Sequence, residues 1–98
     1  MVKASWYGPG FEGKAMANGE PFRAKDPTIA AHNSLPLGTK ILVENPENGR
    51  KLVVTVKDRG PYKKGRKLDL SRAGARKLGY IEDGVAMLDI RIIDYIAN

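Results

Sequence analysis

The segment Lys51–Pro61 reads KLVVTVKDRGP, and the organisation of the whole chain can be worked out from it. Leu52, Val54 and Val56 alternate with other residues, so they share one face of an expected strand, and Asp58 continues the same register. The Gly-Pro pair that follows ends the strand in a turn. The sequence therefore predicts a carboxylate at the end of a buried strand face, beside a turn.

Short elements separated by turn residues lie on both sides of this strand. An Asn-Gly pair within residues 45–49 predicts a hairpin with the preceding strand. Ser71 and Gly79 are typical of a helix N-cap and a helix C-terminal stop. The expected strands cover residues 28–32, 39–44, 50–57 and 67–70 and a segment from residue 86 onward, and the expected helix covers residues 72–78. The first third of the chain is loop-rich, because Gly and Pro are frequent between residues 7 and 22. This pattern favours a mostly β protein that closes into a compact barrel and so hides its strand edges.

Length and composition restrict the chain to few classes of protein. Its 98 residues, of which 42% are hydrophobic, are enough for one compact domain covering residues 1–98. The absence of cysteine excludes disulfides and thiolate chemistry, and a single histidine, His32, is a poor basis for a zinc site. We therefore expect neither a metal nor a cofactor.

The charge of the chain favours an anionic partner. Lys and Arg number 17 against 11 Asp and Glu, which gives a net charge of +6. Nucleic acid, acidic lipid and acidic polysaccharide all fit this charge, but aromatic residues make up only 7% and no basic–aromatic repeat is present. No apolar run approaches the ~20 residues of a membrane helix. No signal peptide is visible, so we expect a cytoplasmic chain or a mature fragment of an exported protein.

Three residues are candidates for catalysis, and each also has a purely structural interpretation. Asp58 is either a turn residue that accepts backbone N–H groups, which the pattern alone favours, or a general acid/base. Burial favours the neutral form of a carboxyl group, whereas six basic residues among the eleven of Lys57–Lys67 favour the charged form. Glu20 is either an exposed loop acid or a group that supports Asp58. His32 is either a hydrogen-bonded structural residue or a proton shuttle.

Other residues are candidates for binding. Asp69 would either stabilise the start of the expected helix or contact a ligand. Tyr7 would either pack in the barrel or stack on a ring, and Arg59 would bind an anionic group of a substrate. The glycines fit no nucleotide-binding or phosphate-binding motif, and no serine nucleophile motif occurs.

Six short motifs, in this order, resemble the double-psi β-barrel domain of the rare lipoprotein A (RlpA) family. They are ASWYG at 4–8, ANGE at 17–20, AAH at 30–32, LPLGT at 35–39, DRGP at 58–61 and LDLS at 68–71. The resemblance covers residues 4–93 and implies a six-stranded double-psi β-barrel with one or two short helices and an open groove. It also implies a monomeric protein of the bacterial cell envelope. Its activity would be that of a lytic transglycosylase, a lyase, on peptidoglycan glycan strands stripped of their peptides.

The resemblance implies a role for each candidate residue. Asp58, Glu20 and His32 would be catalytic, with Asp58 as a single acid/base. It would protonate the oxygen between N-acetylmuramic acid and N-acetylglucosamine, and then deprotonate the C6 hydroxyl so that a 1,6-anhydro end forms. Glu20 and His32 would hold the substrate or tune Asp58.

The implied substrate-binding residues are Tyr7, Asn18, Arg59 and Asp69. Asp58 and Asp69 match two aspartates in the groove of expansins, which the domain resembles more distantly. Arg59 and the basic loop after it would attract the lactyl carboxylates of peptide-free glycan.

Two other functions stay open: a non-catalytic, expansin-like module that binds glycan and loosens the wall, and a basic nucleic-acid-binding barrel. The first is suggested by two departures from the family pattern, both expected at the rim of the groove. Glu12 stands where many relatives have histidine, and the segment Arg23–Pro27 replaces a shorter, more apolar stretch. The lipidated cysteine and the repeat domain of many relatives are not seen, so we expect a trimmed or naturally minimal domain.

Overall fold

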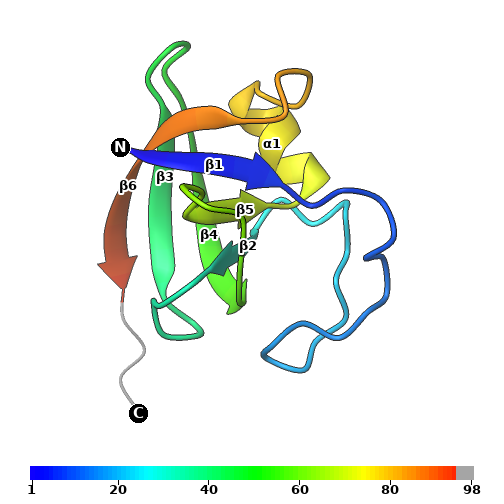
Figure 1. Cartoon of the computed structure of the whole chain (residues 1–98). Helices are drawn as coiled ribbons and strands as arrows, with labels where there is room; N and C mark the ends of the chain where they lie inside the picture. The colour runs from blue at the N-terminus through cyan, green and yellow to red at the C-terminus, as the bar shows by residue number, and fades with distance from the viewer. Residues whose placement is uncertain (95–98) are drawn as a thin grey trace.

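The structure, a computed structural model, describes residues 1–94, which form six strands and one helix (Figure 1). In chain order the elements are β1 (Val2–Trp6), β2 (Ile29–His32), β3 (Lys40–Asn45), β4 (Arg50–Asp58), β5 (Leu68–Leu70), α1 (Arg72–Leu78) and β6 (Ala86–Asp94). The strands close into a barrel in the order β1-β5-β2-β4-β3-β6. Two neighbouring pairs, β1 with β5 and β2 with β4, are parallel, and the other pairs are antiparallel. The prediction of a closed, mostly β barrel is confirmed.

The hairpin of β3 and β4 supplies much of the barrel interior. Ile41 pairs with Val54 and Val43 pairs with Leu52, so apolar side chains of the two strands meet on one face. Ile41, Val43 and Val54 are all fully buried. The alternation that the sequence predicted along β4 therefore holds through the centre of the strand.

The single helix, α1, covers the same residues as predicted and ends where the sequence indicated. The Ser71 side chain accepts a hydrogen bond from the Gly74 N–H at 3.1 Å, and Gly79 follows the helix in the left-handed conformation, with φ 79°. The side chains of Asn45 and Asn48, at the tip of the β3–β4 hairpin, donate to the Leu78 carbonyl at 2.8 and 2.9 Å. The hairpin tip and the helix end are thereby held together, and they lie side by side in Figure 1. No helix within residues 1–94 is long and apolar enough to cross a membrane.

The N-terminal third differs from the prediction of a loop, because β1 begins at Val2. The strand lies between β5 and β6, and its small residue Ala4 is fully buried there. Its five residues include Lys3, Ala4 and Ser5, which carry little strand preference, so the local pattern did not indicate it.

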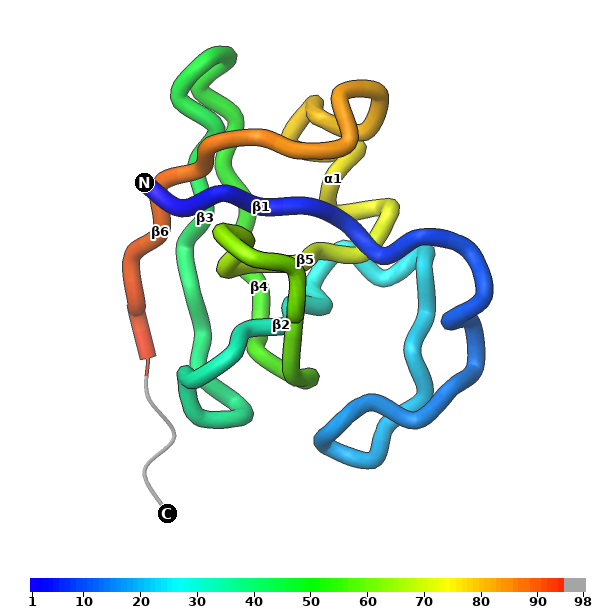
Figure 2. Tube along the Cα trace, in the orientation of Figure 1, coloured from blue at the N-terminus to red at the C-terminus, as the bar shows by residue number. Residues whose placement is uncertain are grey.

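The loop that follows β1, residues 7–28, extends from one side of the barrel (Figure 2). It has a small core of its own. Tyr7, Met16 and Phe22 are buried in this cluster together with Ile29 and Ala31 of β2. The rings of Tyr7 and Phe22 stack with their centroids 4.3 Å apart. This segment is therefore a packed structure, which allows it to hold polar groups in fixed positions.

Candidate active site

A groove of about 380 Å³ opens between the start of the long loop and the ends of β4 and β5. It is lined by residues 5–8 and Phe11 from the N-terminal part, by residues 58–63 and Arg66, and by Asp69 of β5. Two carboxylates, Asp58 and Asp69, therefore line the groove together with the cations Arg59, Lys63 and Arg66. The parallel and antiparallel pairing of β1, β5, β2 and β4 places these segments side by side although they are far apart in sequence.

Asp58 is held by three hydrogen bonds from different parts of the chain. Its Oδ2 accepts from the Tyr7 hydroxyl at 2.7 Å, and its Oδ1 accepts from the N–H groups of Ala17 and Arg59, both at 2.9 Å. The bond from Arg59 is the turn-capping contact that the pattern suggested. The bonds from Tyr7 and Ala17 are long-range contacts that fix the carboxylate at the groove.

A β-bulge in β4 lies directly before Asp58. Ala30 of β2 pairs with Val56, whereas the next residue, Ala31, pairs with Asp58, so Lys57 is the extra residue. The bulge leaves the Lys57 carbonyl able to accept a hydrogen bond from the Asn18 N–H at 3.1 Å. The strict alternation from which the position of Asp58 was extrapolated is therefore interrupted one residue before it.

Asp69 lies on the neighbouring strand and has a different environment. Its Oδ1 accepts a hydrogen bond from the Ser5 hydroxyl at 2.5 Å. Burial raises the pKa of the Asp69 carboxyl above its usual range, although the bond from Ser5 and the charges of Arg66 and Lys63 oppose this. Asp69 thus combines partial desolvation with a position in the groove, which is a common property of functional carboxyl groups.

Aromatic side chains surround the Asp58 end of the groove. Tyr7 packs against Phe22 and Phe11, and burial, together with its hydrogen bond to Asp58, raises the pKa of the Tyr7 hydroxyl far above its ordinary value. The hydroxyl therefore stays a hydrogen-bond donor at any physiological pH.

Tyr62 is a highly exposed aromatic residue of the groove that the sequence pattern did not single out. It is 85% exposed and lies in the loop that directly follows the Asp-Arg-Gly-Pro motif. An exposed ring beside polar groups is suited to packing on a sugar. The sequence shows that Tyr62 directly follows the Asp-Arg-Gly-Pro motif, but only the fold shows that its ring is exposed and not buried in the core.

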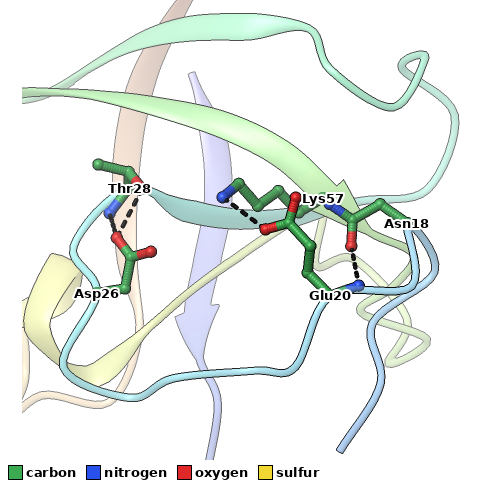
Figure 3. Close-up of polar contacts among 5 residues, drawn as sticks. All are labelled: Asn18, Glu20, Asp26, Thr28 and Lys57. Carbon is green, nitrogen blue, oxygen red and sulfur yellow. Dashed lines mark hydrogen bonds and ion pairs between the residues drawn. The ribbon is translucent and has the colours of Figure 1, made fainter.

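Glu20 and Asn18 do not line the groove, but they belong to the loop that contacts Asp58. Figure 3 shows how both residues lie beside Lys57 of β4. The Glu20 carboxylate forms an ion pair with the Lys57 ammonium, with 3.2 Å between Oε1 and Nζ. The Asn18 side chain accepts from the Glu20 N–H at 2.9 Å, and the Asn18 backbone N–H donates to the Lys57 carbonyl. Both residues therefore fasten the turn at residues 17–20 to the bulge of β4, and this turn carries the Ala17 N–H that binds Asp58.

His32 lies at the end of β2 and makes local contacts. Its Nδ1 accepts hydrogen bonds from the N–H groups of Ser34 and Leu35 at 3.1 and 3.2 Å. Burial, and then the positive charges of Arg59 and Lys67, lower the pKa of the imidazole below its usual value. His32 is thus held in its neutral form, because a protonated Nδ1 could not accept these bonds.

Arg59 connects His32 to the groove. Its guanidinium donates to the carbonyl oxygens of His32 and Leu35 at 3.1 and 2.6 Å, while the residue also lines the groove beside Asp58.

The predicted site residues thus separate into two groups. The structure brings Tyr7, Asp58, Arg59 and Asp69 to one groove. The other three, Glu20, Asn18 and His32, do not line it, and within residues 1–94 no hydrogen bond joins their side chains to either aspartate. No group of three or more His, Cys, Asp or Glu side chains in the same part of the chain is arranged to hold a metal ion.

A second hollow, of about 520 Å³, is larger than the groove and separate from it. It contains Glu12 and Arg23, which form an ion pair at 3.2 Å, and the Glu12 carboxylate also accepts from the Ala24 N–H at 2.9 Å. These contacts, the backbone bond foremost, lower the pKa of Glu12. The two departures from the family pattern therefore meet in this hollow, and neither Glu12 nor residues 23–27 line the groove, contrary to expectation. The groove is the better candidate for catalysis because its carboxylates are not neutralised by an adjacent ion pair.

Comparison with known proteins finds matches over almost the whole chain. The family model described as "Lytic transglycolase" matches residues 1–90. A probable endolytic peptidoglycan transglycosylase RlpA of Aquifex aeolicus is 50% identical over 90 residues, which are 92% of this chain and 39% of that protein. The endolytic peptidoglycan transglycosylase RlpA of Pseudomonas aeruginosa (strain UCBPP-PA14) is 48% identical over 91 residues, which are 93% of this chain and 26% of that protein. The chain thus spans well under half the length of these relatives.

Solved structures with the same fold include the expansin of Clavibacter michiganensis. The apo protein matches with a TM-score of 0.72 and 24% identity, and a point mutant of it in complex with cellohexaose matches with a TM-score of 0.71 and 21% identity. Each match covers 99% of this chain and 51% of the expansin chain. At these identities the likeness shows the fold alone, a double-psi β-barrel.

Proposed function

Because the chain belongs to the lytic transglycolase family, we propose that it cleaves peptidoglycan glycan strands as an endolytic lytic transglycosylase. The bond cleaved is the β-1,4 bond between N-acetylmuramic acid and N-acetylglucosamine, in strands freed of their peptides. The single observation that carries this proposal is Asp58, which three hydrogen bonds hold at a groove lined by a second carboxylate and three cations.

The proposed reaction needs one acid/base and no water. Asp58 in its protonated form transfers its proton to the glycosidic oxygen, and the bond between this oxygen and C1 of the muramic acid breaks. The C6 hydroxyl oxygen of the same sugar attacks C1, and its proton passes to the Asp58 carboxylate. The products are a new N-acetylglucosamine hydroxyl and a 1,6-anhydro ring, and Asp58 is again protonated. An ordinary glycosidase would instead require a second carboxylate to act as base or nucleophile.

The other groove residues have proposed roles in binding. The Tyr7 hydroxyl orients the Asp58 carboxyl group, since it donates to Oδ2 at 2.7 Å. Asp69, with its raised pKa, accepts a hydrogen bond from a sugar hydroxyl or donates one to it. Arg59, together with the cations of the following loop, attracts lactyl carboxylates of the strand.

Three residues that do not line the groove have proposed supporting roles, namely Glu20, Asn18 and His32. Glu20 and Asn18 act through Lys57 and hold the turn whose Ala17 N–H binds Asp58 (Figure 3). His32 keeps its loop in place through Nδ1 and, through its carbonyl, positions Arg59. We therefore propose that these three residues position the acid/base.

The relatives are named as peptidoglycan transglycosylases, which supports the proposal that this chain works in the bacterial cell envelope. We further propose that residues 1–98 act as a single monomeric domain whose partner is the glycan strand, without a role in nucleic-acid binding or membrane insertion. The excess of positive charge then serves attraction to an acidic polysaccharide.

The test is mass spectrometry of peptide-free peptidoglycan after digestion. We expect wild-type protein to release fragments with 1,6-anhydromuramic ends and the Asp58→Asn variant to release at least about a hundred times fewer, as is usual when a general acid is lost. Asp89→Asn is the matched control, because Asp89 is an exposed aspartate on β6, away from the groove. A folded wild-type protein that leaves no anhydro ends would refute the enzyme proposal.

A binding module without catalysis is the second candidate, and the exposed ring of Tyr62 at the groove favours it. Such a module would be retained on insoluble peptidoglycan, and Tyr62→Ala would weaken this retention, while no soluble fragment appears. If the Asp58→Asn variant is still retained on insoluble peptidoglycan but releases no anhydro fragments, the result supports the enzyme over the binding module.

A further inference from the structure

The hollow beside α1 carries an unusual concentration of positive charge. Four cations line it, namely Arg23 and Lys25 of the long loop and Arg72 and Arg76 of the helix, against the single carboxylate of Glu12. Glu12 pairs with Arg23, whereas the other three cations take part in no ion pair within residues 1–94. The hollow therefore presents an excess of positive charge to solvent.

Arg72 and Arg76 of the helix lie in an unfavourable electrostatic arrangement, for two reasons. Arg72 is the first residue of α1, where the helix dipole disfavours a cation, and the first turn contains no acidic residue. Arg72 and Arg76 are four residues apart, a spacing at which like charges repel each other on one helix face. Both line the hollow. A bound anion would relieve these repulsions, so the arrangement favours a binding role over a structural one.

We propose that this hollow is a second, non-catalytic binding site for lactyl carboxylates of peptide-free peptidoglycan glycan. This inference rests on the proposed function, since it takes the anion from the same substrate. Arginine guanidinium groups bind carboxylates through paired hydrogen bonds, and two arginines on one helix face can engage a carboxylate together with Lys25.

Peptide-free glycan is a ligand whose chemistry fits both the groove and the hollow beside α1. A lactyl group is a free carboxylate only where the peptide has been removed, because the peptide is attached through that group. The hollow and the groove share no lining residue, but Phe11 of the groove and Glu12 of the hollow are adjacent in the chain. A carboxylate-bearing glycan held in the hollow therefore keeps the groove close to peptide-free segments and gives the enzyme a preference for them.

The experiment compares two double variants in the inactive Asp58→Asn background, so that no ligand is consumed. Arg72→Gln/Arg76→Gln removes two charges from the hollow, and Lys40→Gln/Lys51→Gln removes two exposed charges on β3 and β4, which line neither hollow. Dissociation constants are measured at low salt for soluble peptide-free glycan strands, for neutral chitin oligosaccharides of the same length and for polyphosphate. Thermal unfolding of each variant provides the control for folding.

We expect the arginine variant to bind peptide-free glycan about tenfold more weakly, roughly threefold for each exposed charge pair. The lysine variant should lose less than about twofold, since it keeps the local cluster. Neither variant should change in its binding of the neutral oligosaccharide, and the melting temperature of the arginine variant should be equal to that of the parent or higher.

Three results would overturn the inference. Equal weakening in both variants would show that only net charge matters. Equal weakening toward the neutral oligosaccharide would show a loss unrelated to carboxylates, and equal weakening toward polyphosphate would show a general anion site. Because these measurements need no cleavage, they are independent of the test of catalysis: absent anhydro ends would refute the proposed enzyme, whereas the results above refute only the second site.

Discussion

The two oxygens of the Asp58 carboxylate accept hydrogen bonds from different kinds of donor. Oδ1 is held by backbone N–H groups, whereas Oδ2 is held by the hydroxyl of Tyr7, which itself packs against two phenylalanine rings. A side-chain hydroxyl can be removed without disturbing the backbone, so Tyr7 is the point at which this arrangement can be tested.

Tyr7→Phe should lower the turnover of glycan about tenfold with little change in KM, because the acid/base loses its orientation but not its substrate contacts. Loss of a hydrogen bond to a carboxylate should also reduce the free energy of unfolding by about 1.5 kcal/mol. Tyr62→Phe is the matched control: its hydroxyl makes no hydrogen bond in residues 1–94, so it should stay within about 0.5 kcal/mol of wild type. Equal effects of the two substitutions would contradict the orienting role of Tyr7.

The raised pKa of Asp69 predicts how stability changes with pH. Between the ordinary value of 3.8 and the raised value in the folded protein, the folded state binds more protons than the unfolded state. Stability contributed by this group is therefore fully present below pH 3.8 and is lost as pH rises through the folded pKa. Asp69→Asn stays neutral and should gain stability relative to wild type over this range, by about 1.4 kcal/mol for each tenfold difference between the two ionisation constants. Urea unfolding of both proteins at a series of pH values measures this difference; a constant difference would contradict the prediction.

At the scale of elements, the bulge of β4 and the turn at residues 17–20 act as one unit. The bulge exposes the Lys57 carbonyl to Asn18, and the Lys57 side chain, only 20% exposed, reaches the more exposed Glu20. An ion pair of this exposure stabilises the fold by at most about 1 kcal/mol, so its importance lies in placing the turn.

A double-mutant cycle tests whether Glu20 acts through Lys57. Glu20→Gln and Lys57→Met should each lower product formation by about threefold to tenfold, and the double variant should be no worse than the poorer single variant, because both remove the same contact. Lys51→Met, at an exposed lysine on the same strand, should have no effect. If the double variant lost activity by the product of the two single losses, or if Lys57→Met kept full activity, Glu20 would act on the substrate directly.

At the scale of the whole molecule, β6 closes the barrel by pairing with both β1 and β3. Its side chains alternate between the interior and solvent, so that Leu88 is fully buried while its neighbour Met87 is 49% exposed. Closure leaves the loops at the barrel ends as the places where polar groups can gather, and the groove is formed there.

Leu88→Ala should reduce the free energy of unfolding by about 2–5 kcal/mol, because it removes buried methyl groups from the core and leaves a cavity. Met87→Ala, one residue away on the opposite face, should change it by less than about 0.5 kcal/mol. Urea unfolding of both variants provides the measurement. Similar losses in the two proteins would mean that β6 does not close the barrel in this register.

Elements that depend on near neighbours could be predicted from the sequence. The alternation of Val54 and Val56, the Ser71 cap and the Gly79 stop are local patterns, so the bounds of α1 and the course of the hairpin followed from them. The ordered motifs also indicated the family. Strand β1 was missed, since its small residues become a strand only through pairing with β5 and β6.

The surroundings of Asp58 could not be predicted from the sequence, because they depend on the folded chain. Tyr7 is 51 residues away in the chain and Ala17 is 41 residues away, and no local pattern states that they meet one carboxylate. Closure of the barrel brings them together. The bulge at Lys57 breaks the alternation of β4, so the face on which the Asp58 side chain lies could not be inferred from that alternation.

The tertiary structure also decided where the departures from the family pattern lie. Glu12 and Arg23 line a separate hollow instead of the expected rim of the groove. The Ala24 carbonyl, next to Arg23, accepts a hydrogen bond from the Ala73 N–H of α1 at 3.0 Å, which holds this part of the long loop beside the helix. Contacts between distant segments are set by packing of the whole chain, which is why the residues were predictable and their arrangement was not.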